Sequence, residues 1–134
     1  KLSKRYHLVQ TNRFLDKNSL ITWPLHRRIL TKLRFILLFL FLGIKCDSSG
    51  AFRCYNFNKL NYKLLLFAKN NSYSFFWETI YILTKENCKI KEISIMQKYR
   101  SIGSSKLKMS DWFNGLFYLF EVFIKDLLNI NYKK

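Results

Sequence analysis

The chain has 134 residues, which is enough for one domain, and its 24 lysines and arginines against 8 aspartates and glutamates give a net charge of +16. Such an excess of positive charge favours anionic partners: nucleic acid, anionic lipid or a phosphorylated substrate. With 49% hydrophobic and 18% aromatic residues, the composition is not that of a disordered chain.

The first half of the chain predicts two short strands on either side of a long helix. The elements are Tyr6 to Val9, a helix from Pro24 to about Ile44, and Ala51 to Tyr55. The first half of the helix is basic, whereas its second half is apolar all round, as in a helix that is buried or faces lipid. Gly43 is expected to end this helix.

The second half of the chain predicts three helices and one strand. These are a helix from Lys59, capped by Asn58, to about Lys69; a helix from Ser74 to about Asn87; a strand from Lys89 to Ile95; and a helix from Ser110 to about Asn131. The last helix has one narrow polar stripe, and its many apolar side chains cannot all bury against so small a domain. We therefore divide the chain into residues 1–109 and an amphipathic, interfacial helix at 110–134.

Cysteine usage and apolar run lengths indicate the compartment. Cys46, Cys54 and Cys88 form no Cys-x-x-Cys pair, and no histidine lies at metal-ligand spacing, so reduced thiols in the cytoplasm are expected. The longest apolar run, Phe35 to Leu42, is far shorter than the roughly 20 residues that span a bilayer. Cations such as Arg34 flank the apolar segments, so we expect a peripheral protein on a membrane surface.

The run DSSGAFRCY, from Asp47 to Tyr55, combines a carboxylate, two hydroxyls, a glycine and an arginine directly after the apolar helix. Such a corner suits a phosphate-bearing substrate, because planar guanidinium groups bind phosphate oxygens in pairs. A Gly-Ser-Ser-Lys loop later in the chain has donors of the same kind, at residues 103–106.

Six segments carry a resemblance in consistent order and spacing. They are Tyr6 to Phe14, Trp23 to Arg28, Asp47 to Tyr55, Tyr73 to Glu78, Lys91 to Ile95, and Arg100 to Lys106. Together they resemble the acceptor-side half of the family-2 glycosyltransferases, in particular the polyprenyl-phosphate (dolichyl-phosphate) mannosyltransferases. The Asp47 run is similar to the family's DxTGxFRxY, and the last segment to its RxxGxSK.

The resemblance implies an α/β fold: a partial GT-A-like domain of a few short strands with helices, lacking the N-terminal nucleotide-binding half. The complete enzyme would move a hexose, mannose or glucose, from a nucleotide sugar to a polyprenyl phosphate, with inversion. It would need Mg²⁺ or Mn²⁺, but the sequence contains no Asp-x-Asp motif, so we expect this chain alone to bind no metal and to be inactive. The missing half is then a further expected partner.

The same resemblance assigns roles to individual residues. Asp47 is the candidate catalytic carboxylate, although it could instead bind the backbone of its own loop. The phosphate- and substrate-binding candidates are Arg13, Arg28, Ser49, Arg53, Arg100, Ser105 and Lys106. Because the acceptor oxygen is already anionic, the chemistry needs charge neutralisation and alignment more than a strong base. For Arg53, an ion pair with Asp47 or Glu78 is the competing interpretation, and Glu78 itself is expected to be structural.

A non-catalytic basic protein that binds anionic membrane or nucleic acid is the alternative function. Interleaved aromatic and basic residues suit single-stranded nucleic acid. The basic residues are dispersed, however, and the apolar runs are too long for a stacking platform. We therefore expect no nucleic-acid partner.

Overall fold

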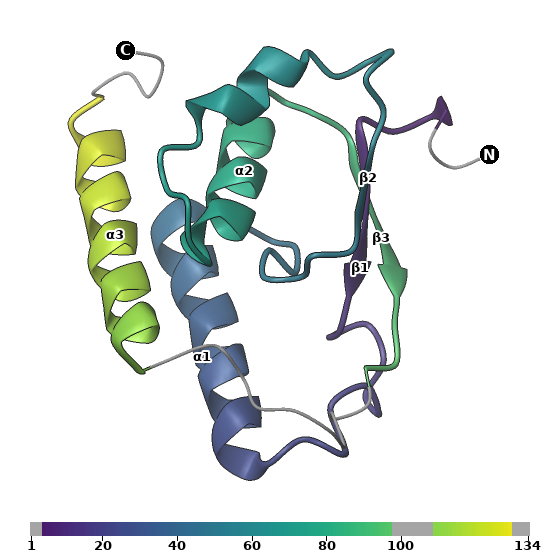
Figure 1. Cartoon of the computed structure of the whole chain (residues 1–134), viewed down its shortest axis with the longest axis vertical. Coiled ribbons are helices and arrows are strands. Elements are labelled where there is room, and N and C mark those ends of the chain that lie inside the picture. The colour runs from purple at the N-terminus through teal and green to yellow at the C-terminus, as the bar shows by residue number, and fades with distance from the viewer. Residues whose placement is uncertain (1–3, 98–108, 130–134) are drawn as a thin grey trace.

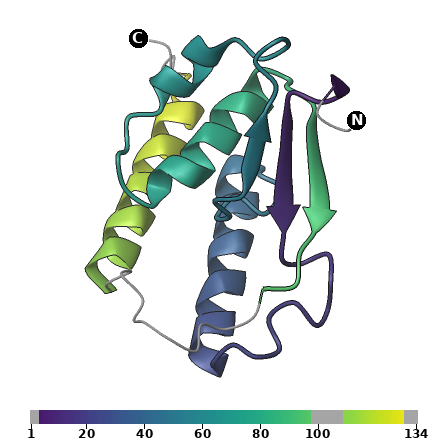
Figure 2. The same cartoon turned by 45° about the vertical axis from the view of Figure 1, so that its right-hand side comes forward.

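The computed structural model describes residues 4–97 and 109–129. The elements in these ranges are β1 (Leu8–Asn12), α1 (Leu25–Leu42), β2 (Arg53–Tyr55), a 3-10 helix (Tyr62–Phe67), α2 (Ser74–Lys85), β3 (Ile90–Ser94) and α3 (Met109–Leu127). The strands form one mixed sheet in the order β2–β1–β3, with β1 antiparallel to β2 and parallel to β3. All three helices lie on the same side of this sheet (Figures 1 and 2). The α/β class predicted from the sequence is confirmed.

Strand β1 begins two residues later and ends three residues later than predicted, because polar side chains occupy its inner face. Leu8, Gln10 and Asn12 alternate with half-buried residues and point to the buried side. Gln10 is only 2% exposed. A buried amide is tolerated only when it is hydrogen-bonded, and Glu92 of the neighbouring strand is one of its partners, 3.1 Å away.

Helix α1 follows Pro24, which occupies the N-cap position in an extended conformation. The helix ends as predicted at Gly43, whose φ of 65° is left-handed and strains any residue with a side chain. The Gly43 amide donates to the Phe39 carbonyl oxygen at 3.0 Å, and the Ile44 amide to that of Leu38 at 3.3 Å. Leu38 and Leu42 are buried, so the apolar half of α1 faces the core on one side only.

The helix predicted from Lys59 to Lys69 is wrong in length and type. The chain forms only a 3-10 helix, and its cap is Asn61, whose Oδ1 accepts from the Lys63 amide at 3.1 Å. This segment buries none of its own side chains fully, so no apolar face extends the helix. The predictions of a helix beginning at Ser74 and of a strand over β3 are confirmed.

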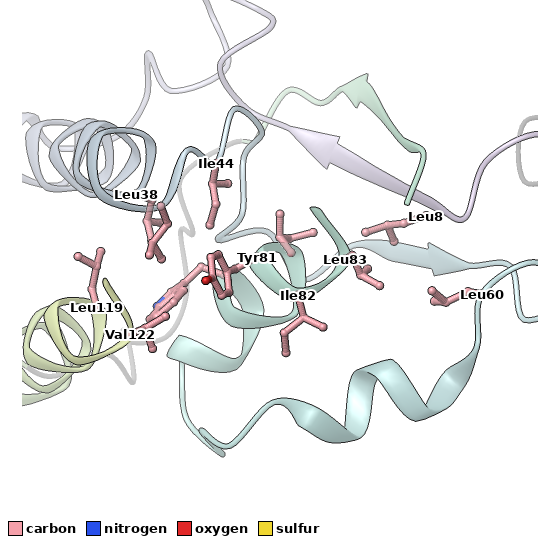
Figure 3. Close-up of a cluster of buried hydrophobic side chains, with 12 residues drawn as sticks. Leu8, Leu38, Ile44, Leu60, Tyr81, Ile82, Leu83, Leu119 and Val122 are labelled. Atoms are coloured by element: carbon pink, nitrogen blue, oxygen red, sulfur yellow. The ribbon is translucent and has the colours of Figure 1, made fainter. Parts of the chain in front are cut away.

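One hydrophobic core joins the three helices and the sheet (Figure 3). Helix α2 is central to it, with Trp77 1% exposed and Ile80 and Leu83 fully buried. Helix α3 contributes Leu119 and Val122 to the same cluster. The C-terminal helix is therefore packed onto the rest of the chain through one face, and its opposite face remains exposed.

Candidate active site at the carboxyl end of the parallel strands

The two parallel strands end at the same edge of the sheet, where Asn12 of β1 lies beside Ser94 of β3. Arg13 directly follows β1, and the loop after α1 brings Asp47 to this edge. Ligand sites of α/β proteins favour the carboxyl ends of parallel strands. The position predicted from sequence motifs and the position favoured by topology therefore coincide.

Arg13 and Asp47 form a two-pronged ion pair. Nε of Arg13 donates to Oδ2 of Asp47 at 2.8 Å, and Nη2 donates to Oδ1 at 2.9 Å. The Arg13 amide adds a bond to Oδ2 at 3.1 Å, and the Ser49 hydroxyl and amide donate to Oδ1 at 3.1 and 3.3 Å. The Asp47 side chain is 1% exposed and that of Arg13 is 10% exposed. The structure brings three of the predicted site residues, Arg13, Asp47 and Ser49, together in one cluster.

Protonation of Asp47 is controlled by this pairing. Burial by itself would raise the pKa of Asp47, but hydrogen bonds and charge from Arg13, with a smaller contribution from Ser49, hold that pKa below its usual value. The carboxylate is therefore ionised at neutral pH and already accepts five hydrogen bonds. Such a group orients its partners well, whereas its low basicity makes it a weak proton acceptor.

Glu92 supports the corner from β3, although sequence reasoning did not select it. Its Oε1 accepts from the Asp47 amide at 2.8 Å and from Nε2 of Gln10 at 3.1 Å. Its Oε2 accepts from Nδ2 of Asn12 at 2.9 Å. Glu92 lies within the segment that resembles the family, so the signal was present, but only the sheet register reveals that it reaches Asp47.

Arg53 lies beside the corner and connects it to α2. Its guanidinium donates to the Ser48 carbonyl oxygen at 2.9 Å, to that of Phe76 at 2.6 Å and to Oγ1 of Thr79 at 2.7 Å. It also lies 5.4 Å from the centre of the Phe76 ring. These partners are carbonyl and hydroxyl oxygens, so the ion pair with Asp47 or Glu78 that the sequence left open does not form. Its phosphate-binding role stays a prediction.

The structure does not bring the remaining predicted site residues that it describes to the corner. Arg28 is half-buried on α1, and its side chain forms no hydrogen bond or ion pair within the described ranges. Arg100, Ser105 and Lys106 lie outside the described residues. Gln97 is the last described residue before them: Nε1 of Trp23 donates to its carbonyl oxygen at 2.9 Å, and the Arg13 guanidinium lies 5.9 Å from the Trp23 ring.

Arg34, which the sequence groups with the cations that flank the apolar segments, lies on the wall of a pocket between α1, α2 and α3. Burial, and secondarily the charge of Arg13, lower the pKa of Arg34 to about 10. Arg34 and Arg13 are thus close enough for their positive charges to repel each other.

The corner does not fit a metal ion. Within residues 4–97 and 109–129, no three histidine, cysteine, aspartate or glutamate side chains gather as a metal site would require. The carboxylate of Asp47 is already occupied by Arg13 and Ser49.

Comparison with models of known protein families found no match, and searches of curated proteins and of solved structures found none either. The assignment of a function to this corner therefore depends on the residues and geometry described above.

Proposed function

We propose that this chain is the acceptor-side part of a glycosyltransferase that moves a hexose, mannose or glucose, from a nucleotide sugar to a polyprenyl phosphate. The observation that supports this most is the convergence of Arg13, Asp47 and Ser49 at the carboxyl end of the parallel strands. In this proposal the donor sugar nucleotide and its metal ion bind to a part of the enzyme other than this chain.

In this proposal Asp47 positions Arg13, and Arg13 binds the acceptor phosphate. Nε and Nη2 of Arg13 are bound to Asp47 and Ser49. The N–H groups of Nη1 find no acceptor among residues 4–97 and 109–129, so they are available to a phosphate oxygen. A guanidinium held in place before the substrate arrives loses little entropy on binding it.

A lipid acceptor requires access to a membrane, and the surface of α1 suits one. Every exposed position of this helix is apolar or basic: Leu25, His26, Ile29, Lys32, Leu33, Ile36, Phe39 and Leu40. On α3 the exposed apolar side chains Phe113, Phe117, Phe120, Ile124 and Leu127 repeat every three or four residues. Among the described helices, none has the length and hydropathy to span a bilayer. Both stripes fit the headgroup boundary of an anionic membrane.

Transfer activity tests the proposal. The native protein, purified in detergent as the cell makes it, is incubated with a radiolabelled GDP-mannose or UDP-glucose, Mg²⁺ or Mn²⁺, and a polyprenyl phosphate. We expect a labelled, acid-labile lipid, and Arg13→Lys should lower kcat/KM by roughly 10²-fold, as when a charge-stabilising donor is misplaced. Lys17→Met, an exposed change in the next loop, is the matched control. The proposal is contradicted if neither GDP-mannose nor UDP-glucose gives a labelled lipid.

Membrane binding without catalysis is a second candidate, which the apolar and basic face of α1 favours. Lys32→Glu should weaken binding to vesicles containing phosphatidylserine by roughly thirtyfold, at about 1 kcal/mol for each unit of charge near the surface. Lys63→Glu on the 3-10 helix, away from α1, should change it much less. Vesicle flotation gives the affinities, and titration with single-stranded RNA gives the comparison. Tighter binding to RNA than to vesicles would contradict membrane binding, both for the proposed transferase and for the protein without catalysis.

A further inference from the structure

Glu92 of β3 accepts hydrogen bonds from two other segments of the chain. It lies opposite Gln10 in the parallel pairing of β1 and β3. Its Oε1 accepts from Nε2 of Gln10 and from the Asp47 amide, and its Oε2 accepts from Nδ2 of Asn12. In the described part of the chain, no lysine, arginine or histidine lies at ion-pair distance from Glu92. Its three partners are therefore all neutral groups.

These bonds fix the backbone on both sides of the Arg13–Asp47 ion pair. On one side, the Asp47 amide donates to Glu92. On the other side, Asn12 donates to Glu92 through Nδ2, while its Oδ1 accepts from the Phe14 amide at 2.6 Å. Arg13 lies between Asn12 and Phe14 in the chain. One carboxylate therefore sets the positions of both members of the ion pair.

A carboxylate at position 92 satisfies these donors, and an amide of the same size does not. The two oxygens of Glu92 both accept, whereas a glutamine would present one oxygen and one NH₂ group. That NH₂ group would face Nδ2 of Asn12, so that two donors oppose each other. Asn12 cannot turn its oxygen towards position 92, because Oδ1 already accepts from the Phe14 amide.

We propose that Glu92 is a positioning residue for phosphate binding at this corner. Through Asn12 and Asp47 it holds Arg13 so that the N–H groups of Nη1 keep one direction. A guanidinium whose anchors can move loses more entropy when it binds an anion. The phosphate as ligand rests on the proposed function, whereas the fixed position of Arg13 does not.

Charge and position predict opposite effects of Glu92→Gln. The substitution removes a negative charge near the proposed phosphate site, so electrostatics alone would tighten anion binding. Loss of positioning weakens it instead, and we expect the Kd for geranyl phosphate, measured by calorimetry on the full chain, to rise about tenfold. Asp16→Asn is the matched control: it removes the same charge from the loop after Arg13, away from these bonds, and should not raise the Kd. Equal or tighter binding by Glu92→Gln than by the parent protein would overturn the proposal.

The Nε–Hε group of Arg13 reports its position without any ligand. Nε donates to Oδ2 of Asp47 at 2.8 Å, so this proton should exchange slowly with water. Glu92→Gln should accelerate the exchange about tenfold, as the pair opens more often. An unchanged exchange rate would reject the role of Glu92 and leave the proposed function standing. A parent protein that does not bind geranyl phosphate would reject the proposed function, and the exchange rate would still decide the role of Glu92.

Exchanging the two side chains provides a rescue. In the double variant Asn12→Asp, Glu92→Gln, the glutamine NH₂ group donates to one aspartate oxygen, and the other oxygen accepts from the Phe14 amide. The net charge is that of the parent protein, and all the bonds are restored. We expect slow exchange at Arg13 and an affinity for geranyl phosphate near that of the parent. Fast exchange in a double variant that melts like the parent would contradict positioning through these bonds.

A second single variant keeps the test valid if Glu92→Gln does not fold. Asn12→Ser removes the donor to Glu92 but keeps a side-chain oxygen that can accept from the Phe14 amide two residues on. It should accelerate exchange at Nε of Arg13 in the same direction. Exchange as slow as in the parent protein would overturn the proposal.

Discussion

Replacing Asp47 with alanine is expected to destabilise the protein by about 3–5 kcal/mol, the range for removing one partner of a buried ion pair. The change leaves the Arg13 guanidinium, whose side chain is 10% exposed, without a counter-ion. It also removes the acceptor for the Arg13 and Ser49 amides. Urea unfolding followed by circular dichroism measures the free energy directly.

Two controls identify the ion pair as the cause. Asp16→Ala removes a carboxylate that accepts only from the Asn18 amide in an exposed turn, so its cost should be near 1 kcal/mol. The double variant Arg13→Met, Asp47→Leu should lose less than the two single changes together, because no charge is left unpaired. A loss below about 1 kcal/mol for Asp47→Ala would show that the pair contributes nothing net.

The pH dependence of stability provides an independent check on Asp47. Its pKa is lower in the folded chain than in the unfolded chain, so the pair stabilises the fold above the unfolded pKa of about 3.9. That stabilisation should be lost progressively as pH falls through the folded pKa. Asp47→Asn should flatten this part of the curve. An unchanged acid profile in Asp47→Asn would contradict the assignment.

Replacing Glu78 with leucine should cost about 3 kcal/mol or more, since three hydrogen-bond donors lose their charged acceptor at once. Glu78 is fully buried. Its Oε1 accepts from the Lys69 amide at 2.8 Å and from the Tyr118 hydroxyl at 2.7 Å, and its Oε2 accepts from the Asn70 amide at 3.0 Å. One carboxylate thus ties the loop before α2 to α3.

Hydrogen exchange localises the effect of this change. The amides of Lys69 and Asn70 should lose protection in Glu78→Leu, while Tyr118→Phe should cost only about 1 kcal/mol. Glu121→Ala is the matched control, because this exposed carboxylate on α3 pairs only with Lys125 one turn away. Retained protection of both amides would show that the loop is held by other contacts.

The sequence predicted the helices and strands best where a local signal determines them. Gly43 marks the end of α1 because only a left-handed residue closes the helix there. The helix predicted to begin at Ser74 begins there, and the strand predicted from Lys89 begins one residue later, at Ile90. The 3-10 helix was misjudged because Asn58 and Asn61 are both plausible caps, and only packing decides between them.

The candidate site was predictable in its local parts and not in its long-range ones. Asp47 and Ser49 are two residues apart, so their contact follows from the loop. The bond of Asp47 to Glu92 spans 45 residues, and the buried strand residue Gln10 donates to Glu92 and to the Asp47 carbonyl oxygen, both far from it in sequence. The position of Arg34 on a pocket wall likewise depends on where α3 packs, which the sequence does not show.

The proposed function requires Arg13, at the carboxyl end of the parallel strands, to bind one phosphate group together with Arg100. Nuclear magnetic resonance of the arginine Nε–Hε groups, titrated with geranyl phosphate in the full chain, tests it most directly. Arg13 should give a separate signal because its Nε is bound to Asp47 at 2.8 Å. The claim predicts that the Arg13 and Arg100 signals shift together and saturate with one Kd. An Arg13 signal that stays fixed while the Arg100 signal shifts would contradict it. Shifts of the two signals that do not saturate would contradict it as well.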